Sequence, residues 1–481
     1  MPLGVPLGLP FRVRERGFPL KTAARYERAD ASGGGPAGFG WVDEFIARVR
    51  PYIFVRTEDN ILIKRPNNAV KINATGAAIL KSLLDGMSMD GLAEKLEFDP
   101  AKIAESVRFV ATVKEHLQGT LDPLACNPSV ELVPFDMKFS EYPVLSEVAL
   151  TYRCNLSCRF CYAGCGGSRR LRPGRGEMTA AEARAIVTKL YCQAKVPSVS
   201  FTGGEPTLAP HLLELIAFAK KTGMRVNLIS NGTMIDGPYA RRLADSGLDS
   251  AQISLEAPDA PVHDAMVGVA GAFEKTADAV RLLKACGIAT HTNTTVTRLN
   301  RRACAGLPSF VKQELGCDKF SMNLMIPVGS GADDGSLKVA YEEIGPFIKD
   351  MIEVSEKAGV EFMWYSPVPM CMFNTVAHGL GNRGCAACDG LISVAANGDV
   401  LPCASCDDSV GSLLRNDFRD LWASPKAKRY RAKGLAHDRC KHCENFHICN
   451  GACPLYWRSV GFAELERHAG AMIKEPCALS S

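Results

Sequence analysis

The nineteen cysteines of this 481-residue chain are unevenly spaced, and their spacing limits the possible folds more than any other feature. None precedes Cys126, four lie from Cys154 to Cys165, and ten lie from Cys371 to Cys477. Small secreted domains use disulfides in place of a large core, but a chain of this length can bury a core without them. Clustered thiols in a non-secreted chain more often bind metal. We therefore expect metal centres in two regions of a reduced protein.

Composition and charge narrow the class further. The chain is 47% hydrophobic and 22% charged, which is typical of globular proteins, and its net charge of +4 predicts neither a nucleic-acid nor a membrane partner. No uncharged run reaches the ~18 residues that span a bilayer. Residues 1–45 are rich in Pro, Gly and Arg and lack the apolar run of a signal peptide, so they predict an irregular arm on a cytoplasmic protein.

Residues 46–125 have the pattern of a small separate domain. Two runs rich in β-branched and aromatic residues, 52–56 and 61–64, predict strands. Three helical patterns follow, with helix starts at Asn73 or Thr75, at Ser88, and at Asp99-Pro100. Two strands followed by three helices predict a winged-helix-like domain. A purely structural domain is the alternative, and the absence of a basic face argues against DNA binding.

Residues 140–358 alternate predicted strands with predicted helices. The strands are expected at 144–151, 198–201, 225–229, 250–255, 289–297 and 319–323, and the helices at 180–192, 209–221, 239–245, 272–285, 303–314 and 341–358. This alternation predicts βαβ units and a parallel sheet. Six strands are too few for an eight-stranded barrel, so the fold class is α/β with an open or partial (β/α)6 barrel. Its functional face should lie at the carboxyl ends of the strands.

The first cysteine cluster follows the first of these strands. Cys154, Cys158 and Cys161 have the spacing C-x3-C-x2-C. Three thiolates on one loop can bind three irons of a cubane and leave the fourth iron open, and soft thiolates suit iron–sulfur clusters. The alternative is a structural zinc site, which needs four ligands and would take Cys165 as the fourth.

This motif, with Phe160 directly before Cys161, resembles that of the radical S-adenosylmethionine (radical SAM) enzymes. Three polar strand ends support the resemblance: Gly203-Gly204-Glu205, Ser230-Asn231 and Ser254-Leu255-Glu256. The resemblance implies that Cys154, Cys158 and Cys161 bind a [4Fe–4S] cluster and that the strand ends bind S-adenosylmethionine. Glu205 would take the methionine ammonium group, and Ser230 and Asn231 would contact the ribose and carboxylate.

Residues 359–481 are rich in loops and cysteines, which predicts too little core to fold without metal. Their spacing is similar to the SPASM extension of radical SAM peptide maturases, and this resemblance implies two auxiliary [4Fe–4S] clusters and three clusters in total. The inner cluster would use Cys385, Cys388, Cys403 and Cys453, and the outer cluster would use Cys440, Cys443, Cys449 and Cys477. Cys371 and Cys406 are possible alternative ligands, and one or two zinc ribbons are the alternative to clusters.

The whole layout resembles peptide maturases that form intrapeptide thioethers between Cys and Asp or Glu. Resemblance implies a peptide or small-protein substrate bound through the 46–125 domain, and a flavodoxin- or ferredoxin-like electron donor. Some relatives have an acid directly after the inner-cluster cysteine, but Ala404 follows Cys403 here. Asp236 is our candidate proton acceptor, with helix capping as its alternative role. Carbon–carbon crosslinking, epimerisation or oxidation of a peptide, or a non-catalytic iron–sulfur scaffold or chaperone, are the alternative functions.

Overall fold

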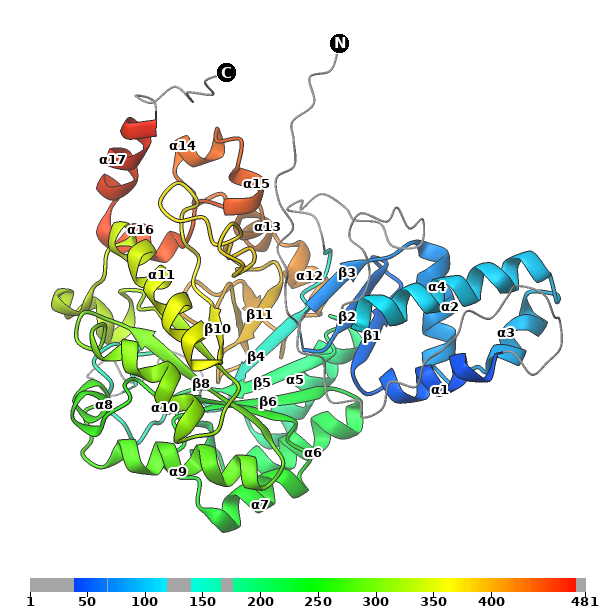
Figure 1. Cartoon of the computed structure of the whole chain (residues 1–481), viewed down its shortest axis with the longest axis horizontal. Helices are drawn as coiled ribbons and strands as arrows, with labels where there is room; N and C mark the ends of the chain where they lie inside the picture. Colours follow the sequence, from blue (N-terminus) through cyan, green and yellow to red (C-terminus); the bar gives the residue numbers. More distant parts are fainter. Residues whose placement is uncertain (1–38, 67, 119–139, 166–175, 473–481) are drawn as a thin grey trace. The chain divides into compact units, whose positions relative to one another are not determined.

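The computed structural model describes residues 39–66, 68–118, 140–165 and 176–472. Its contacts divide the chain into two compact units, which Figure 1 shows coloured along the sequence. The first unit runs to Lys64 and from Asn68 to Val133, and the second holds the rest. Among the described residues, no helix combines the length and the apolar character needed to cross a membrane.

The first unit is a three-stranded antiparallel sheet with helices before and after it. In chain order it contains α1 (Gly40–Val49), β1 (Ile53–Arg56), β2 (Ile61–Lys64), β3 (Asn68–Lys71), α2 (Ala74–Leu84), α3 (Met89–Lys95) and α4 (Pro100–Gln118). The strand order is β1-β2-β3, so β2 is central. The predicted caps Asn73 and Ser88 are confirmed, because their side chains accept the N–H groups of Gly76 and Gly91.

Two elements of this unit were not predicted. Helix α1 occupies residues 40–45 of the expected irregular arm and buries Val42 and Ile46. No side-chain cap marks its first residue, so its start has no signal in the sequence. Strand β3 is only four residues long and half-buried, so it lacks the alternation of a longer strand. The unit therefore contains the predicted two strands and three helices, with a third strand and a preceding helix that make it a small antiparallel sheet domain. Residues 1–38 and 119–125 of the predicted domains lie outside the described residues.

The second unit is built on one ten-stranded sheet of order β10-β9-β8-β7-β6-β5-β4-β11-β12-β13. The first seven strands along the chain are β4 (Leu145–Ala149), β5 (Ser198–Thr202), β6 (Arg225–Ser230), β7 (Ser250–Ser254), β8 (Ala289–Val296), β9 (Lys319–Leu324) and β10 (Glu361–Trp364). The main helices between them are α5 (Ala180–Cys192), α6 (Leu212–Thr222), α7 (Gly237–Asp245), α8 (Ala260–Val267), α9 (Ala272–Ala285), α10 (Leu307–Gln313) and α11 (Tyr341–Ala358). All seven strands are parallel, which confirms the α/β partial barrel and adds β10 and α8 to it.

The two faces of this sheet differ in polarity because side chains alternate along each strand. One face packs in the apolar core, with Val199, Phe201 and Leu228 among its buried residues. The other face carries hydrogen-bonded polar side chains across neighbouring strands, such as the bond from Asn227 Nδ2 to Ser200 Oγ (3.2 Å). Asn293 and Ser321 continue this polar face on β8 and β9, where their side chains bond at 2.9 Å. A polar surface therefore leads to the carboxyl ends of the strands.

The C-terminal region is continuous with the barrel. Strand β11 (Leu391–Val394) pairs in parallel with β4, and β12 (Asp399–Leu401) and β13 (Gly411–Ser412) extend the sheet in antiparallel fashion. The helices that follow are α12 (Phe418–Ala423), α13 (Pro425–Arg431), α14 (Asp438–Lys441), α15 (Phe446–Cys449), α16 (Pro454–Val460) and α17 (Ala463–Met472). Trp422, Tyr456 and Trp457 are buried in the same core as the barrel residues. The region thus shares the barrel core, which corrects the expectation that metal must replace one.

Candidate active site

The loop with Cys154, Cys158 and Cys161 begins just after β4, at the carboxyl end of the sheet (Figure 1). Helix α8 holds this loop, because its carbonyl groups at Val267 and Met266 accept the N–H groups of Ser157 (2.9 Å) and Arg159 (3.3 Å). A small apolar cluster lies under it, formed by Leu156, Met266, Val267 and Ala272, with Phe160 packed against them. These backbone contacts with α8 fix the position of the cysteines. The sequence analysis did not predict this helix.

Gly203 and Gly204 join the end of β5 to the start of the cysteine loop. The N–H of Gly204 donates to the carbonyl of Thr151 (2.7 Å), and the N–H of Glu205 donates to that of Arg153 (2.9 Å). A Cβ at Gly203, whose φ is +145°, would lie 2.2 Å from the Thr151 oxygen, and one at Gly204 would lie 2.4 Å from the Arg153 oxygen. Within the chain itself, both glycines are thus required for the close approach of two loops.

Glu205 is fully buried and connects the ends of β5 and β6. Its Oε1 accepts bonds from Thr207 N (3.0 Å), Thr207 Oγ1 (2.6 Å) and Ser230 Oγ (2.8 Å), and its Oε2 accepts from Asn231 N (2.8 Å). Burial raises the pKa of this carboxyl, although the hydrogen bonds oppose that shift. Asn231 also places its Nδ2 3.9 Å from Cys154 Sγ. The structure therefore brings Glu205, Ser230 and Asn231 together beside the first cysteine.

The end of β7 contributes Ser254, which is half-buried, and Glu256, which is buried. Oε2 of Glu256 accepts the N–H of Thr295 at 2.7 Å, and the N–H of Glu256 itself donates to Nδ1 of His263 at 3.1 Å. Burial raises the pKa of Glu256 to about 8. His263 and Thr295 were not predicted as site residues.

The three thiols of the loop differ in their electrostatics. Burial raises the pKa of Cys154 and of Cys158, and the carboxyl groups of Glu205 and Glu256 raise them further. Hydrogen bonding from the Cys165 thiol lowers the pKa of Cys161 to about 6. In the described part of the chain, no three His, Cys, Asp or Glu side chains converge as the ligands of a single metal ion would. Cubane thiolates bind separate irons, so three soft donors spaced along one loop fit such a cluster.

A second group of cysteines gathers in the C-terminal region. Burial raises the pKa of Cys385, Cys403 and Cys453, and the neighbouring thiols raise it further, which shows that these residues lie near one another. Cys388 and Cys406 are each 1% exposed and lie in the same neighbourhood. Cys406 is therefore as buried as the predicted fourth ligand Cys388, and the choice between them stays a prediction.

The cysteines predicted for the outer cluster lie on short helices near the surface. Cys440 lies in α14, Cys449 ends α15, and Cys443 is exposed between them. The N–H of Met370 donates to Cys449 Sγ at 3.3 Å, and Cys371 follows directly. The structure brings Cys371 near this group, whereas the predicted fourth ligand Cys477 lies outside the described residues.

Asp236 lies at the start of α7 and is exposed. Its Oδ1 accepts the N–H of Tyr239 at 2.8 Å, which is the geometry of a helix N-cap. The structure thus shows the alternative role that the sequence suggested for this residue. Its role as a proton acceptor stays a prediction.

Comparison with known families agrees with this geometry. The family model described as the radical SAM superfamily matches residues 148–302, and the SPASM model, described as an iron–sulfur cluster-binding domain, matches residues 385–444. These matches identify a radical SAM partial barrel and a SPASM domain in the chain. S-adenosylmethionine and [4Fe–4S] clusters are the typical cofactors of proteins with these two domains.

Relatives of this radical SAM/SPASM protein have several activities. The AdoMet-dependent heme synthase of Oleidesulfovibrio alaskensis is 29% identical over 350 residues, which cover 68% of this chain and 84% of the relative. The PqqA peptide cyclase of Rhodopseudomonas palustris is 25% identical over 320 residues, covering 65% and 82%. The crystal structure of Streptococcus suis SuiB bound to its precursor peptide SuiA has a TM-score of 0.63 at 17% identity, covering 85% of this chain and 96% of that one, and shows a shared fold.

Proposed function

We propose that this radical SAM/SPASM enzyme modifies a peptide or small protein by forming intrapeptide thioethers between Cys and Asp or Glu. The proposal rests on the resemblance of the sequence layout to the maturation protein of quinohemoprotein amine dehydrogenase. Carbon–carbon crosslinking, epimerisation and oxidation are alternative outcomes on the same class of substrate.

The small antiparallel sheet of the first unit is the main observation that supports a peptide substrate. Strand β3 bonds to β2 on one side only within the described residues, and its four residues are half-buried or exposed. The opposite edge, β1, is mostly buried. An exposed edge strand can pair with an extended peptide, which supplies backbone hydrogen bonds that a small metabolite does not need. The likeness in fold to SuiB, solved with a precursor peptide, supports the same reading.

The reaction needs three contributions from this chain. Cys154, Cys158 and Cys161 would hold a cluster with an open iron, which together with bound S-adenosylmethionine would supply the radical chemistry for removing hydrogen from an unactivated C–H bond. Glu205, Ser230 and Asn231 lie beside Cys154, where they would orient the sulfonium. Forming the C–S bond releases the thiol proton and one electron, for which Asp236 and the inner cluster are the proposed acceptors. A flavodoxin- or ferredoxin-like donor would provide the electron that starts each cycle.

A second candidate function is heme formation, favoured by the 29% identity to heme synthases. Those relatives match 63–68% of this chain. A tetrapyrrole would need no edge strand for recognition. Formation of heme by the purified protein, with no reaction on any peptide, would support this candidate over the first.

The deciding experiment is an anaerobic assay with dithionite, S-adenosylmethionine and the short Cys-, Asp- and Glu-rich peptide expected from a neighbouring reading frame. We expect 5′-deoxyadenosine and a peptide lighter by two hydrogens for each crosslink. An epimer would keep its mass, and a scaffold would give no 5′-deoxyadenosine. Tandem mass spectrometry would then locate the joined residues, and a product without a Cys-to-Asp or Cys-to-Glu link would contradict the thioether proposal.

A further inference from the structure

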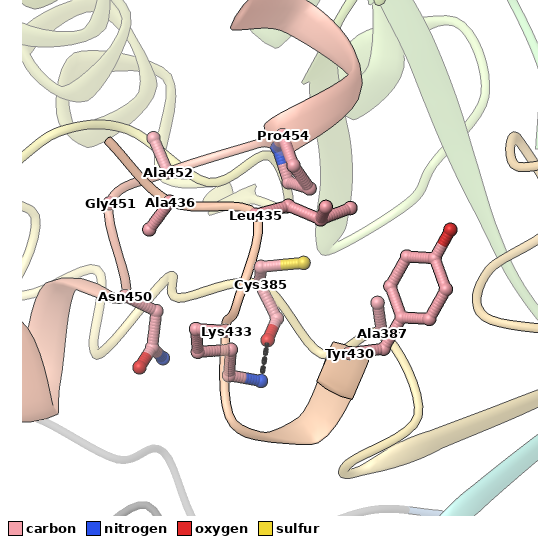
Figure 2. A pocket seen from close by; sticks show the side chains of 10 residues that line it. All are labelled: Cys385, Ala387, Tyr430, Lys433, Leu435, Ala436, Asn450, Gly451, Ala452 and Pro454. Atoms are coloured by element: carbon pink, nitrogen blue, oxygen red, sulfur yellow. Dashed lines mark hydrogen bonds between the residues drawn. The ribbon is translucent and has the colours of Figure 1, made fainter. Parts of the chain in front are cut away.

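Two cations of the C-terminal region, the buried Lys433 and the half-buried Arg431, hold the cysteine loop 385–389 by its backbone. Lys433 donates from Nζ to the carbonyl oxygen of Cys385 at 2.6 Å, as the dashed line in Figure 2 shows. Arg431 donates from Nη1 to the carbonyl oxygen of Cys388 at 3.2 Å. Both residues come from one turn at the end of α13, so a single segment holds two of the predicted cluster ligands. We call Arg431 and Lys433 the basic pair.

The burial of Lys433 makes the basic pair unusual. The Lys433 side chain is 3% exposed, and its charge partner is Asp389, whose Oδ2 lies 2.8 Å from Nζ. Arg431 lies over the ring of Trp422, with Cζ 4.8 Å from the ring centroid, and donates to the Trp422 carbonyl at 2.7 Å. A buried lysine is costly unless anions compensate it. Among the described residues, Asp389 is the one carboxylate paired with the two cations, which leaves a net positive charge at the loop.

That charge lies next to the thiols rather than elsewhere in the domain. Lys433 lines the same pocket as Cys385, with Tyr430, Asn450 and Gly451 on its walls (Figure 2). The Lys433 ammonium lies against the Cys385 backbone and the Arg431 guanidinium against the Cys388 backbone, so both cations lie at the loop that carries the two thiols. Positive charge at this distance stabilises negative charge on a centre bound by these thiols.

We propose that the basic pair positions the Cys385–Cys388 loop and raises the reduction potential of the cluster bound there. One-electron reduction adds one negative charge to an already anionic, thiolate-ligated centre, and nearby positive charge stabilises the more negative state. The pair thus favours this centre as an acceptor of the electron released on C–S bond formation. This inference rests on the cluster assignment made under the proposed function.

The test uses charge-changing variants of the full-length, anaerobically reconstituted protein. Lys433→Gln removes a cation, Asp389→Asn removes the neighbouring anion, and Lys428→Gln removes an exposed lysine of α13 as the matched control. Iron and sulfide content are measured first, and reduction potentials then come from titrations followed by electron paramagnetic resonance. The signal of the inner cluster is identified as the one lost in Cys403→Ala.

We expect Lys433→Gln to shift the inner-cluster potential to a more negative value and Asp389→Asn to shift it to a more positive one. Lys428→Gln should leave it unchanged. Equal potentials in the wild type and the three variants would overturn the proposal. Shifts of the same sign in Lys433→Gln and Asp389→Asn would also overturn it. If Lys433→Gln loses iron, Asp389→Asn alone decides. Iron loss in both variants would show that Lys433 and Asp389 only maintain the loop, and would overturn the proposed effect on the reduction potential.

The same measurements separate this proposal from the cluster assignment. Full iron content in Cys403→Ala would reject an inner cluster at these residues, and with it the role of the basic pair. Retained clusters with unshifted potentials would reject only the basic pair. The crosslinking assay is not needed for either decision.

Discussion

The two cysteine loops of the second unit are held by different means. The loop of Cys154–Cys161 is fixed by backbone hydrogen bonds from α8 and by the close approach of Gly203 and Gly204. The loop of Cys385–Cys388 is fixed by the side chains of Arg431 and Lys433. The charged groups that act on the first loop's thiols include the carboxyls of Glu205 and Glu256, whereas two cations, Arg431 and Lys433, and one carboxylate, Asp389, lie at the second loop.

This difference separates two kinds of redox centre. The arginines next to the first cysteines are about half exposed and pair with acids, Arg153 with Glu177 at 3.7 Å and Arg159 with Asp334 at 2.5 Å. They therefore add little positive charge to the site. Within the described residues, no buried cation lies beside this loop, which would suit a strongly reducing centre, whereas the cations at the second loop would suit an electron acceptor. The comparison predicts that the two loops respond differently to the same kind of substitution.

The largest expected effect comes from removing one thiol at each loop. Cys158→Ala should abolish 5′-deoxyadenosine formation, because the open-site cluster needs all three loop thiolates. Cys385→Ala should still cleave S-adenosylmethionine but lose crosslinking. Iron content, 5′-deoxyadenosine and peptide mass are measured on each variant, with the exposed Cys192→Ala as control. Loss of cleavage in Cys385→Ala to the same degree would mean that the two loops are not functionally distinct.

The next prediction concerns the pH dependence of stability that comes from Glu256 at the first site. Its pKa of about 8 lies above the ordinary 4.5, so the folded state binds this proton more tightly than the unfolded state. The contribution of Glu256 to the free energy of unfolding should be constant below about pH 4.5, fall as the pH rises toward 8, and level off above that pH. Glu256→Gln removes that loss, worth up to a few kcal/mol. The free energy of unfolding in urea, measured from pH 5 to pH 9, should therefore increasingly favour the variant.

Two controls sharpen this test. Comparing variant with wild type at each pH cancels the titration of other groups, including His263, whose pKa burial lowers to about 4. Glu274→Gln, an exposed glutamate on α9, should show no such trend. A difference between Glu256→Gln and wild type that stays constant with pH would show that this carboxyl ionises normally.

A smaller effect tests the backbone attachment of the first loop. Gly204→Ala would place a Cβ 2.4 Å from the Arg153 carbonyl oxygen, which is backbone and cannot rotate away. We expect a loss of about 1–3 kcal/mol in unfolding free energy and weaker S-adenosylmethionine binding. Gly335→Ala is the matched control, since a Cβ there meets nothing within 4 Å. Normal stability and binding in Gly204→Ala would mean that the loop can shift at little cost.

The alternation of strands and helices was readable from the sequence because each βα unit has its own hydrophobic period. The starts of α5, α9 and α11 agree with the prediction, and the capping box at Thr179 and Glu182 explains the first of these. The parallel pairing of β11 with β4 was not readable, because it joins Leu391 to Leu145 across the whole barrel sequence. Local patterns carry no information on such a distant pairing.

The candidate site likewise contains residues that local sequence patterns predict and residues that they do not. The cysteines and polar strand ends were identified because their spacing is itself a chemical pattern. The supports were missed: α8 holds the first loop through carbonyl groups, which any residue provides, and Lys433 is only one of many lysines until its burial is known. Residues that act by backbone contact or by buried charge therefore need the three-dimensional structure.

The smallest expected effect on stability concerns Asp236, which the comparison leaves outside both loops. Asp236→Asn keeps an N-cap and should change the unfolding free energy by a few tenths of a kcal/mol, whereas Asp236→Ala should cost about 1 kcal/mol. If Asp236 accepts the thiol proton, both variants should lose crosslinking while forming 5′-deoxyadenosine normally, because Asn cannot take a proton. Crosslinking at the wild-type rate in Asp236→Asn would leave this residue with helix capping alone, and the proton acceptor would then have to be sought among the carboxyls at the strand ends.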